Sequence, residues 1–170
     1  MPVQDVASAL IEGLDQLHSM GITHGNISPE TILLDGNKLV ISDFSRAGLL
    51  NADATSAFRT DIEMAASTIL FALSGGLAEE TDFDDLLKAA KTGFAEETVV
   101  LFDGIRAGRL EAIDLLRAMT CGAPLLDCLE RPFFWSRDRT AAYLGEEIGN
   151  LLDPSATKDS PHYPFIEALE

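Results

Sequence analysis

Apolar residues recur at helical spacing near the start of the chain. Between residues 3 and 19 they fall three or four positions apart and form one stripe, made of Val3, Val6, Ala7, Leu10, Ile11, Leu14 and Leu17. This spacing predicts an amphipathic helix with one buried face. Gly21 follows, and glycine commonly closes a helix in the left-handed conformation. We therefore expect a helix over residues 3–19.

The pattern then changes to two short apolar runs. Residues 32–34 (Ile-Leu-Leu) and 39–41 (Leu-Val-Ile) flank the segment Asp35-Gly36-Asn37-Lys38. Short apolar runs on either side of an Asp-Gly turn are typical of a β-hairpin. We therefore predict a small hairpin here.

Residues 45–60 contain few large apolar groups and are predicted to form a loop. Thr60-Asp61-Ile62-Glu63 then has the form of a capping box, which would start a helix at this point. The helix would continue through an almost entirely apolar run and end at Gly75-Gly76. Because its remaining face is Ala and Ser, we expect it to be buried on most sides.

The rest of the chain is predicted to be helical, with one exception. Apolar spacing indicates helices near residues 82–91, 95–103, 109–119, 124–130 and 137–152. The tail from Asp153 carries three prolines and is predicted to be poorly ordered. The fold class is therefore mainly α, of the α+β type, with one small hairpin.

Charge and apolar run length limit the kind of protein this is. Lys and Arg number 12 against 28 Asp and Glu, a net charge of −16. Such a surface repels phosphate backbones, so nucleic acid is a poor direct partner. No apolar run approaches the length that spans a bilayer, and no signal peptide opens the chain. We expect a cytoplasmic protein without a membrane segment, in which Cys121 and Cys128 are buried thiols.

Residues 24–45 carry a motif. They read His24-Gly25-Asn26-Ile27-Ser28-Pro29-Glu30-Thr31-Ile32-Leu33-Leu34, then the predicted hairpin, then Ser42-Asp43-Phe44-Ser45. This stretch resembles the catalytic loop (H-R-D-L-K-P-x-N-I-L-L) and the D-F-G metal loop of protein kinases. The resemblance implies a kinase-like C-terminal lobe. The N-terminal lobe, with its Gly-rich loop and strand lysine, is expected to be absent.

A second resemblance begins at Cys128. The run Cys128-Leu-Glu-Arg-Pro-Phe-Phe-Trp-Ser136, followed by Arg-Asp-Arg and an apolar helix, resembles the junction between kinase lobe and nuclease extension in RNase L and the unfolded-protein-response kinase/endoribonuclease. The implied domains are a degenerate kinase-like large lobe over residues 1–134 and a truncated kinase-extension nuclease (KEN) domain over residues 135–170. The nuclease residues of that family would lie farther along than this chain reaches.

The resemblance assigns roles residue by residue. The degenerate catalytic loop comprises His24, Asn26 at the base position, Ser28 at the lysine position and Thr31 at the metal-asparagine position. Asn26 cannot accept a proton as a carboxylate does, so no intact catalytic residue is expected. A weak nucleotide site would use Asn26, Thr31 and Asp43, with Asp43 as the residue for Mg²⁺. Structural roles are implied for Phe44 beside His24, for Asp61 as the brace of the catalytic loop, and for Phe133, Phe134 and Trp135 as anchors.

These roles imply a pseudokinase portion of an RNase L-like endoribonuclease, acting as a nucleotide-sensing and dimerisation scaffold and itself inactive. The longer parent protein would bind Mg-ATP or Mg-ADP and form a homodimer, and RNA would be bound only through the nuclease region. The chain alone is expected to need no cofactor. Two alternatives are a stand-alone kinase-like module that binds a protein partner without nucleotide, and a truncated gene product.

Overall fold

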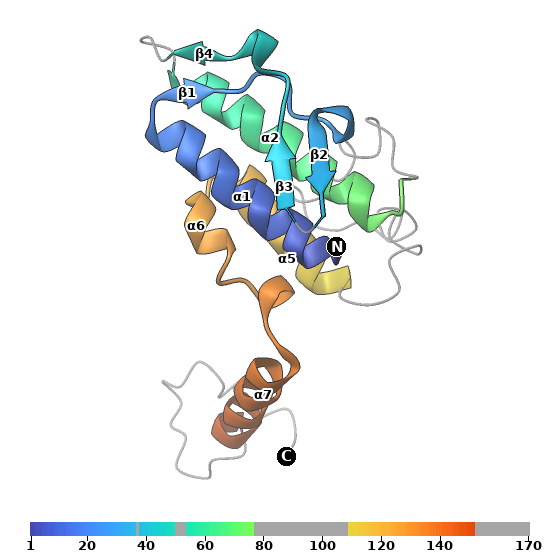
Figure 1. The fold of residues 1–170 in the computed structure, drawn as a ribbon. Coiled ribbons are helices and arrows are strands. Elements are labelled where there is room, and N and C mark those ends of the chain that lie inside the picture. Colours follow the sequence, from blue (N-terminus) through green and yellow to red (C-terminus); the bar gives the residue numbers. More distant parts are fainter. Residues whose placement is uncertain (37, 50–53, 77–108, 152–170) are drawn as a thin grey trace, which may run out of the picture. The chain divides into compact units, whose positions relative to one another are not determined.

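The computed structural model describes residues 1–36, 38–49, 54–76 and 109–151 of the chain (Figure 1). The predicted helices near 82–91 and 95–103 and the tail from Asp153 lie outside these residues. In chain order the helices and strands are α1 (Val3–Ser19), β1 (Ile22–Thr23), β2 (Ile32–Asp35), β3 (Lys38–Ile41), β4 (Gly48–Leu49), α2 (Ala54–Leu73), α5 (Arg109–Thr120), α6 (Leu125–Cys128) and α7 (Arg137–Leu151).

The predicted fold class is confirmed: the described chain is mostly helical with a small antiparallel hairpin, compatible with a kinase-like C-terminal lobe. α1 has the predicted bounds, and α5 and α7 begin at or next to the predicted residues. In the hairpin Ile32 lies opposite Ile41 and Asp35 opposite Lys38. A second two-stranded sheet, β1 with β4, was not predicted, because its strands are only two residues long.

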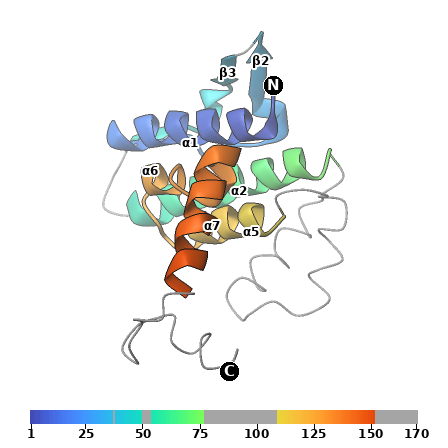
Figure 2. The same cartoon turned by 90° about the horizontal axis from the view of Figure 1, so that it is seen from below.

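The chain divides into two compact units, residues 1–134 and 135–170. In the first unit α2 packs against α1 on one side and α5 on the other (Figure 2). Their buried side chains form one apolar core, to which α1 contributes Ala7, Leu10, Ile11 and Leu14. The core therefore lies between α2 and these two helices, and α2 also carries residues of the candidate site.

The predicted start of the second long helix is wrong. α2 begins at Ala54, so much of the expected loop over residues 45–60 is helical. Thr60 does not cap the helix: its hydroxyl donates to the carbonyl of Ser56, 3.1 Å away, within the helix. Glu63 accepts a hydrogen bond from Arg59, one turn earlier, at 3.1 Å. The apolar run marks the buried part of α2. Its first turns carry mostly small and polar residues, and the single large apolar residue there, Phe58, makes no pattern at helical spacing.

The prediction of two buried thiols is wrong for one of them. Cys128 is fully buried in the core, and burial raises the pKa of its thiol. Cys121 is exposed, because it follows the last residue of α5 at the turn made by Gly122. No helix among the described residues is long and apolar enough to cross a membrane.

Candidate functional site

Asp61 of α2 holds the loop that follows β1. Its side chain is fully buried, and its two oxygens accept the backbone amides of His24 and Gly25, each at 2.7 Å. Nε2 of His18, from α1, lies 3.1 Å from the same carboxylate. Burial raises the pKa of Asp61, but the hydrogen bonds from His18 and the two amides outweigh it, and the pKa lies below its ordinary value. Asp61 is thus a buried carboxylate that joins α1, α2 and the loop.

His24 is fully buried and uses both ring nitrogens within the protein. Nε2 lies 3.0 Å from the carbonyl oxygen of Ser42 and therefore carries the proton, since a carbonyl only accepts. Nδ1 accepts the backbone amide of Asn26 at 3.3 Å. The ring also contacts Phe44 edge-on, with centroids 4.8 Å apart. Through these contacts His24 positions the loop that carries Asn26 and the loop that carries Phe44. Both of its ring nitrogens are occupied, so neither is left for proton transfer.

Asn26 and Asp43 meet directly. Nδ2 of Asn26 donates to Oδ2 of Asp43 at 2.9 Å, and the backbone amide of Ser45 donates to the other carboxylate oxygen at 3.3 Å. Asp43 has a left-handed backbone, with φ of 61°. Hydrogen bonds from Ser45 lower the pKa of Asp43 most, and Asn26 lowers it further. The pair is therefore an exposed carboxylate whose neighbour is a neutral amide.

Thr31 closes the loop on itself. Its buried hydroxyl accepts the backbone amide of Ser28 at 2.9 Å and lies 2.9 Å from the carbonyl oxygen of Asn26. The backbone amide of Thr31 donates to the carbonyl oxygen of Ser28 at 3.0 Å. Of the three residues predicted to form a nucleotide site, Asn26 and Asp43 come together, while the hydroxyl of Thr31 is bonded within the loop.

The two loops offer Mg²⁺ one carboxylate, that of Asp43, so a bound ion would take its other oxygen ligands from nucleotide phosphates and water. Asn26 presents its amide nitrogen, a hydrogen-bond donor, to Asp43, and Thr31 is already bonded. Within the described residues no group of three or more His, Cys, Asp or Glu side chains could hold a metal ion. The residues present therefore do not reproduce the metal site that the kinase pattern implies.

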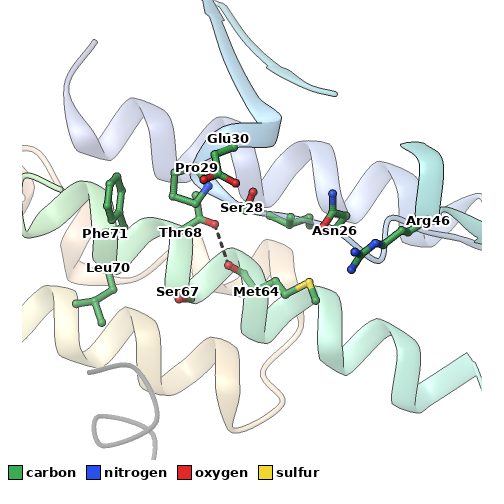
Figure 3. Close-up of a pocket in the computed structure, with 11 residues that line it drawn as sticks. Asn26, Ser28, Pro29, Glu30, Arg46, Met64, Ser67, Thr68, Leu70 and Phe71 are labelled. Carbon is green, nitrogen blue, oxygen red and sulfur yellow. Dashed lines mark hydrogen bonds between the residues drawn. The ribbon is translucent and has the colours of Figure 1, made fainter. Parts of the chain in front are cut away.

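A pocket of about 510 Å³ opens between the loop and α2 (Figure 3). The loop lines it with residues 26–30, Arg46 approaches from the turn after Asp43, and α2 contributes Met64, Ser67, Thr68, Leu70 and Phe71. The sequence motif did not indicate this pocket, because the pocket exists only once α2 is packed beneath the loop.

Sequence reasoning also missed His18, Gly25 and Arg46. His18 lies one turn after Leu14 on the buried stripe of α1, a polar residue on an apolar face, and that position was the available signal. Gly25 has φ of 72°, and a Cβ there would lie 2.7 Å from the carbonyl oxygen of Arg46. The absence of a side chain at Gly25 therefore allows the two loops to touch.

The three aromatic residues predicted to anchor in the lobe divide between the units. Phe133 is buried in the core of the first unit, and Phe134 packs partly against that core. Trp135 belongs to the second unit, where its ring contacts Tyr143 (centroids 5.0 Å apart) and lies under the guanidinium of Arg139. The role of Trp135 as an anchor of the lobe stays a prediction.

The sequence was compared with those of known proteins. No family model matches the chain. The human serine/threonine-protein kinase/endoribonuclease IRE2 is 25% identical over 203 aligned positions, which cover 97% of this chain and 21% of that protein. Two serine/threonine-protein kinases of Saccharomyces cerevisiae match shorter stretches: PKH2 at 39% identity over 38% of the chain, and PKH1 at 49% over 26%. The chain is similar to serine/threonine protein kinases.

The kinase-like chain spans only a small part of these relatives, 6% of PKH2 and PKH1 and 21% of IRE2. The similarity agrees with the loop motif, the mainly helical fold and the hairpin, which all indicate a kinase-like lobe.

Proposed function

We propose that this chain is the phosphotransfer-inactive large lobe of an RNase L-like pseudokinase, with the start of a nuclease extension after residue 134. The observation that carries the proposal is the 2.9 Å hydrogen bond from Asn26 to Asp43. The catalytic-base position of the kinase pattern carries Asn26 and the metal position carries Asp43. The amide of Asn26 donates a hydrogen bond to the carboxylate of Asp43. The protein keeps the kinase-like loop as a structural element.

The chemistry of phosphoryl transfer supports this assignment. A kinase needs a carboxylate to accept the proton of the substrate hydroxyl, and metal ions and a cation to offset charge on the transferring group. Asn26 offers no proton acceptor of that kind at neutral pH. Ser28, at the lysine position, is uncharged. Asp43 remains, and one carboxylate alone does not provide these functions.

The scaffold role rests on the similarity to IRE2, which is named a kinase/endoribonuclease and matches 97% of the chain. In this proposal the longer protein senses a nucleotide at Asn26 and Asp43, with Thr31 holding the loop that carries Asn26. It forms a homodimer, and its nuclease region cuts RNA. The hairpin residues Leu33, Leu34 and Val40, each 45–58% exposed, supply an apolar surface for a neighbouring lobe.

The first test measures transfer of the γ-phosphate of radiolabelled Mg-ATP to the chain itself and to a generic protein substrate. We expect no transfer above the protein-free blank, for the wild type and for Asp43→Ala alike. Transfer by the wild type that Asp43→Ala abolishes would overturn the assignment as inactive.

A second measurement separates the scaffold from the alternative, a partner-binding module without nucleotide. A ligand that binds the native state raises its melting temperature. Nucleotide sensing therefore predicts that Mg-ADP raises the Tm of the wild type, and that Asp43→Ala removes the rise. No rise, with cooperative unfolding, would favour the partner-binding module. Aggregation of the purified chain would favour the truncated product.

Asn26→Asp is expected to make stability depend on Mg²⁺. The substitution places a second carboxylate beside Asp43, and two carboxylates at this separation repel unless a cation or a proton lies between them. We expect Asn26→Asp to have a lower Tm than the wild type in EDTA. Adding Mg²⁺ should raise the Tm of this variant more than it raises the Tm of the wild type. Asn26→Ala, which removes the hydrogen bond without adding charge, is the matched control. An equal response of the two variants to Mg²⁺ would contradict the prediction.

A further inference from the structure

The pocket between the loop and α2 has two chemically different ends. Figure 3 shows Asn26 and Arg46 at one end and Leu70 and Phe71 at the other, with Thr68 between them. Its volume, about 510 Å³, is in the range of small-molecule sites. Asn26 is shared with the proposed nucleotide site, but Arg46 and the α2 residues are not, so the proposed scaffold role does not account for the rest of the pocket.

The polar end carries a cation, Arg46. Arg46 is exposed and has no ion-pair partner among the described residues, in a chain whose net charge is −16. A second pocket, of about 440 Å³, also contains an arginine, Arg59, but that side chain is bonded to Glu63 at 3.1 Å. Of the two arginines, Arg46 is therefore the one available to an anionic ligand.

The apolar residues of α2 limit the length of the rest of the ligand. Met64 and Phe71 both lie on α2, and the helical rise places them about 10 Å apart along its axis. A ligand that reaches from Arg46 to Phe71 therefore needs an apolar body of about that length, such as a fused ring. Glu30, in the wall between the two ends, opposes a second negative charge.

We propose that this pocket binds a small amphipathic monoanion, with its anionic group at Arg46 and its apolar body against Met64, Leu70 and Phe71. The proposal rests on the pocket alone and is independent of the proposed loss of kinase activity.

The probes are dansylglycine and dansylamide, which share a fluorescent apolar ring and differ in one carboxymethyl group, the only anionic group of the pair. Fluorescence titration of the full chain gives an affinity for each. We expect dansylglycine to bind more tightly than dansylamide. Arg46→Gln should weaken dansylglycine about fivefold, the upper end of an exposed ion pair, and leave dansylamide unchanged. Phe71→Ala should weaken both probes, with circular dichroism verifying that the variant is folded.

Arg59→Gln is the matched control, because it removes an arginine from the other pocket and should leave both affinities unchanged. The proposal is overturned if neither probe binds up to millimolar concentration. It is equally overturned if Arg46→Gln leaves the dansylglycine affinity unchanged, or if Arg59→Gln weakens that affinity instead.

Discussion

Replacing Asp61 by alanine is expected to lower the free energy of unfolding by about 3–5 kcal/mol. The carboxylate is fully buried and accepts the amides of His24 and Gly25 at 2.7 Å and the ring of His18 at 3.1 Å. Alanine leaves all three donors without this acceptor, and the amide of His24 is buried where water cannot replace it. Urea denaturation of the wild type and the variant, followed by circular dichroism, measures the difference.

The control for this prediction is Asp127→Asn, on an exposed position of α6, which should change stability by no more than about 0.5 kcal/mol. A loss below about 1 kcal/mol for Asp61→Ala would show that the loop does not depend on this carboxylate.

The acid dependence of stability has a definite sign. The pKa of Asp61 is lowered on folding, so its contribution is complete above the ordinary aspartate pKa of about 4 and is lost as pH falls through the lower folded value. The wild-type carboxylate takes up a proton as pH falls, whereas the amide of Asp61→Asn does not, so the stability of the variant should fall less steeply in this acidic range. If the free energy of unfolding falls with pH in parallel for the wild type and Asp61→Asn, the prediction is wrong.

Elements with local periodicity could be predicted from the sequence, and elements defined by tertiary contacts could not. α1 and the hairpin carry their own patterns, a stripe at helical spacing and two apolar runs around Asp-Gly, and both were predicted with the right residues. The start of α2 was missed because the apolar pattern begins at Ile62, although the helix begins at Ala54. Thr60 and Glu63, which resembled a capping box, bond to other residues of the helix instead: Thr60 to the carbonyl of Ser56 and Glu63 to Arg59.

The same division holds for the candidate site. The motif indicated Asn26 and Asp43 and the loops that carry them, because residue types at fixed spacing survive in the sequence. It did not indicate that the amide of Asn26 would donate to Asp43, nor that Arg46 would line a pocket over α2. Those relations depend on how two loops and a helix pack, and residues far apart in the sequence leave no local pattern for them.

Gly25→Ala is expected to cost about 3 kcal/mol of unfolding free energy, as the sum of two effects. Gly25 has φ of 72°, a conformation that costs a residue with a side chain about 1 kcal/mol. The new Cβ would also lie 2.7 Å from the carbonyl oxygen of Arg46, closer than real Cβ contacts come, so one loop has to shift. Urea denaturation measures the total.

Gly36→Ala separates the two effects. Gly36 also has a positive φ, 60°, but nothing lies within 4 Å of where its Cβ would be, so this variant reports the backbone cost alone. Equal losses for the two variants would show that the contact with Arg46 carries no strain.

A larger loss at Gly25 has a consequence for the kinase-like loop, because the kinase pattern places an arginine at the position of Gly25. With the carbonyl of Arg46 in the space where that side chain would start, restoring the arginine requires the loop after Asp43 to move. The loop that carries Asn26 and the loop that carries Asp43 are therefore fitted to each other, and single substitutions toward the kinase pattern are expected to destabilise the protein before they restore any chemistry.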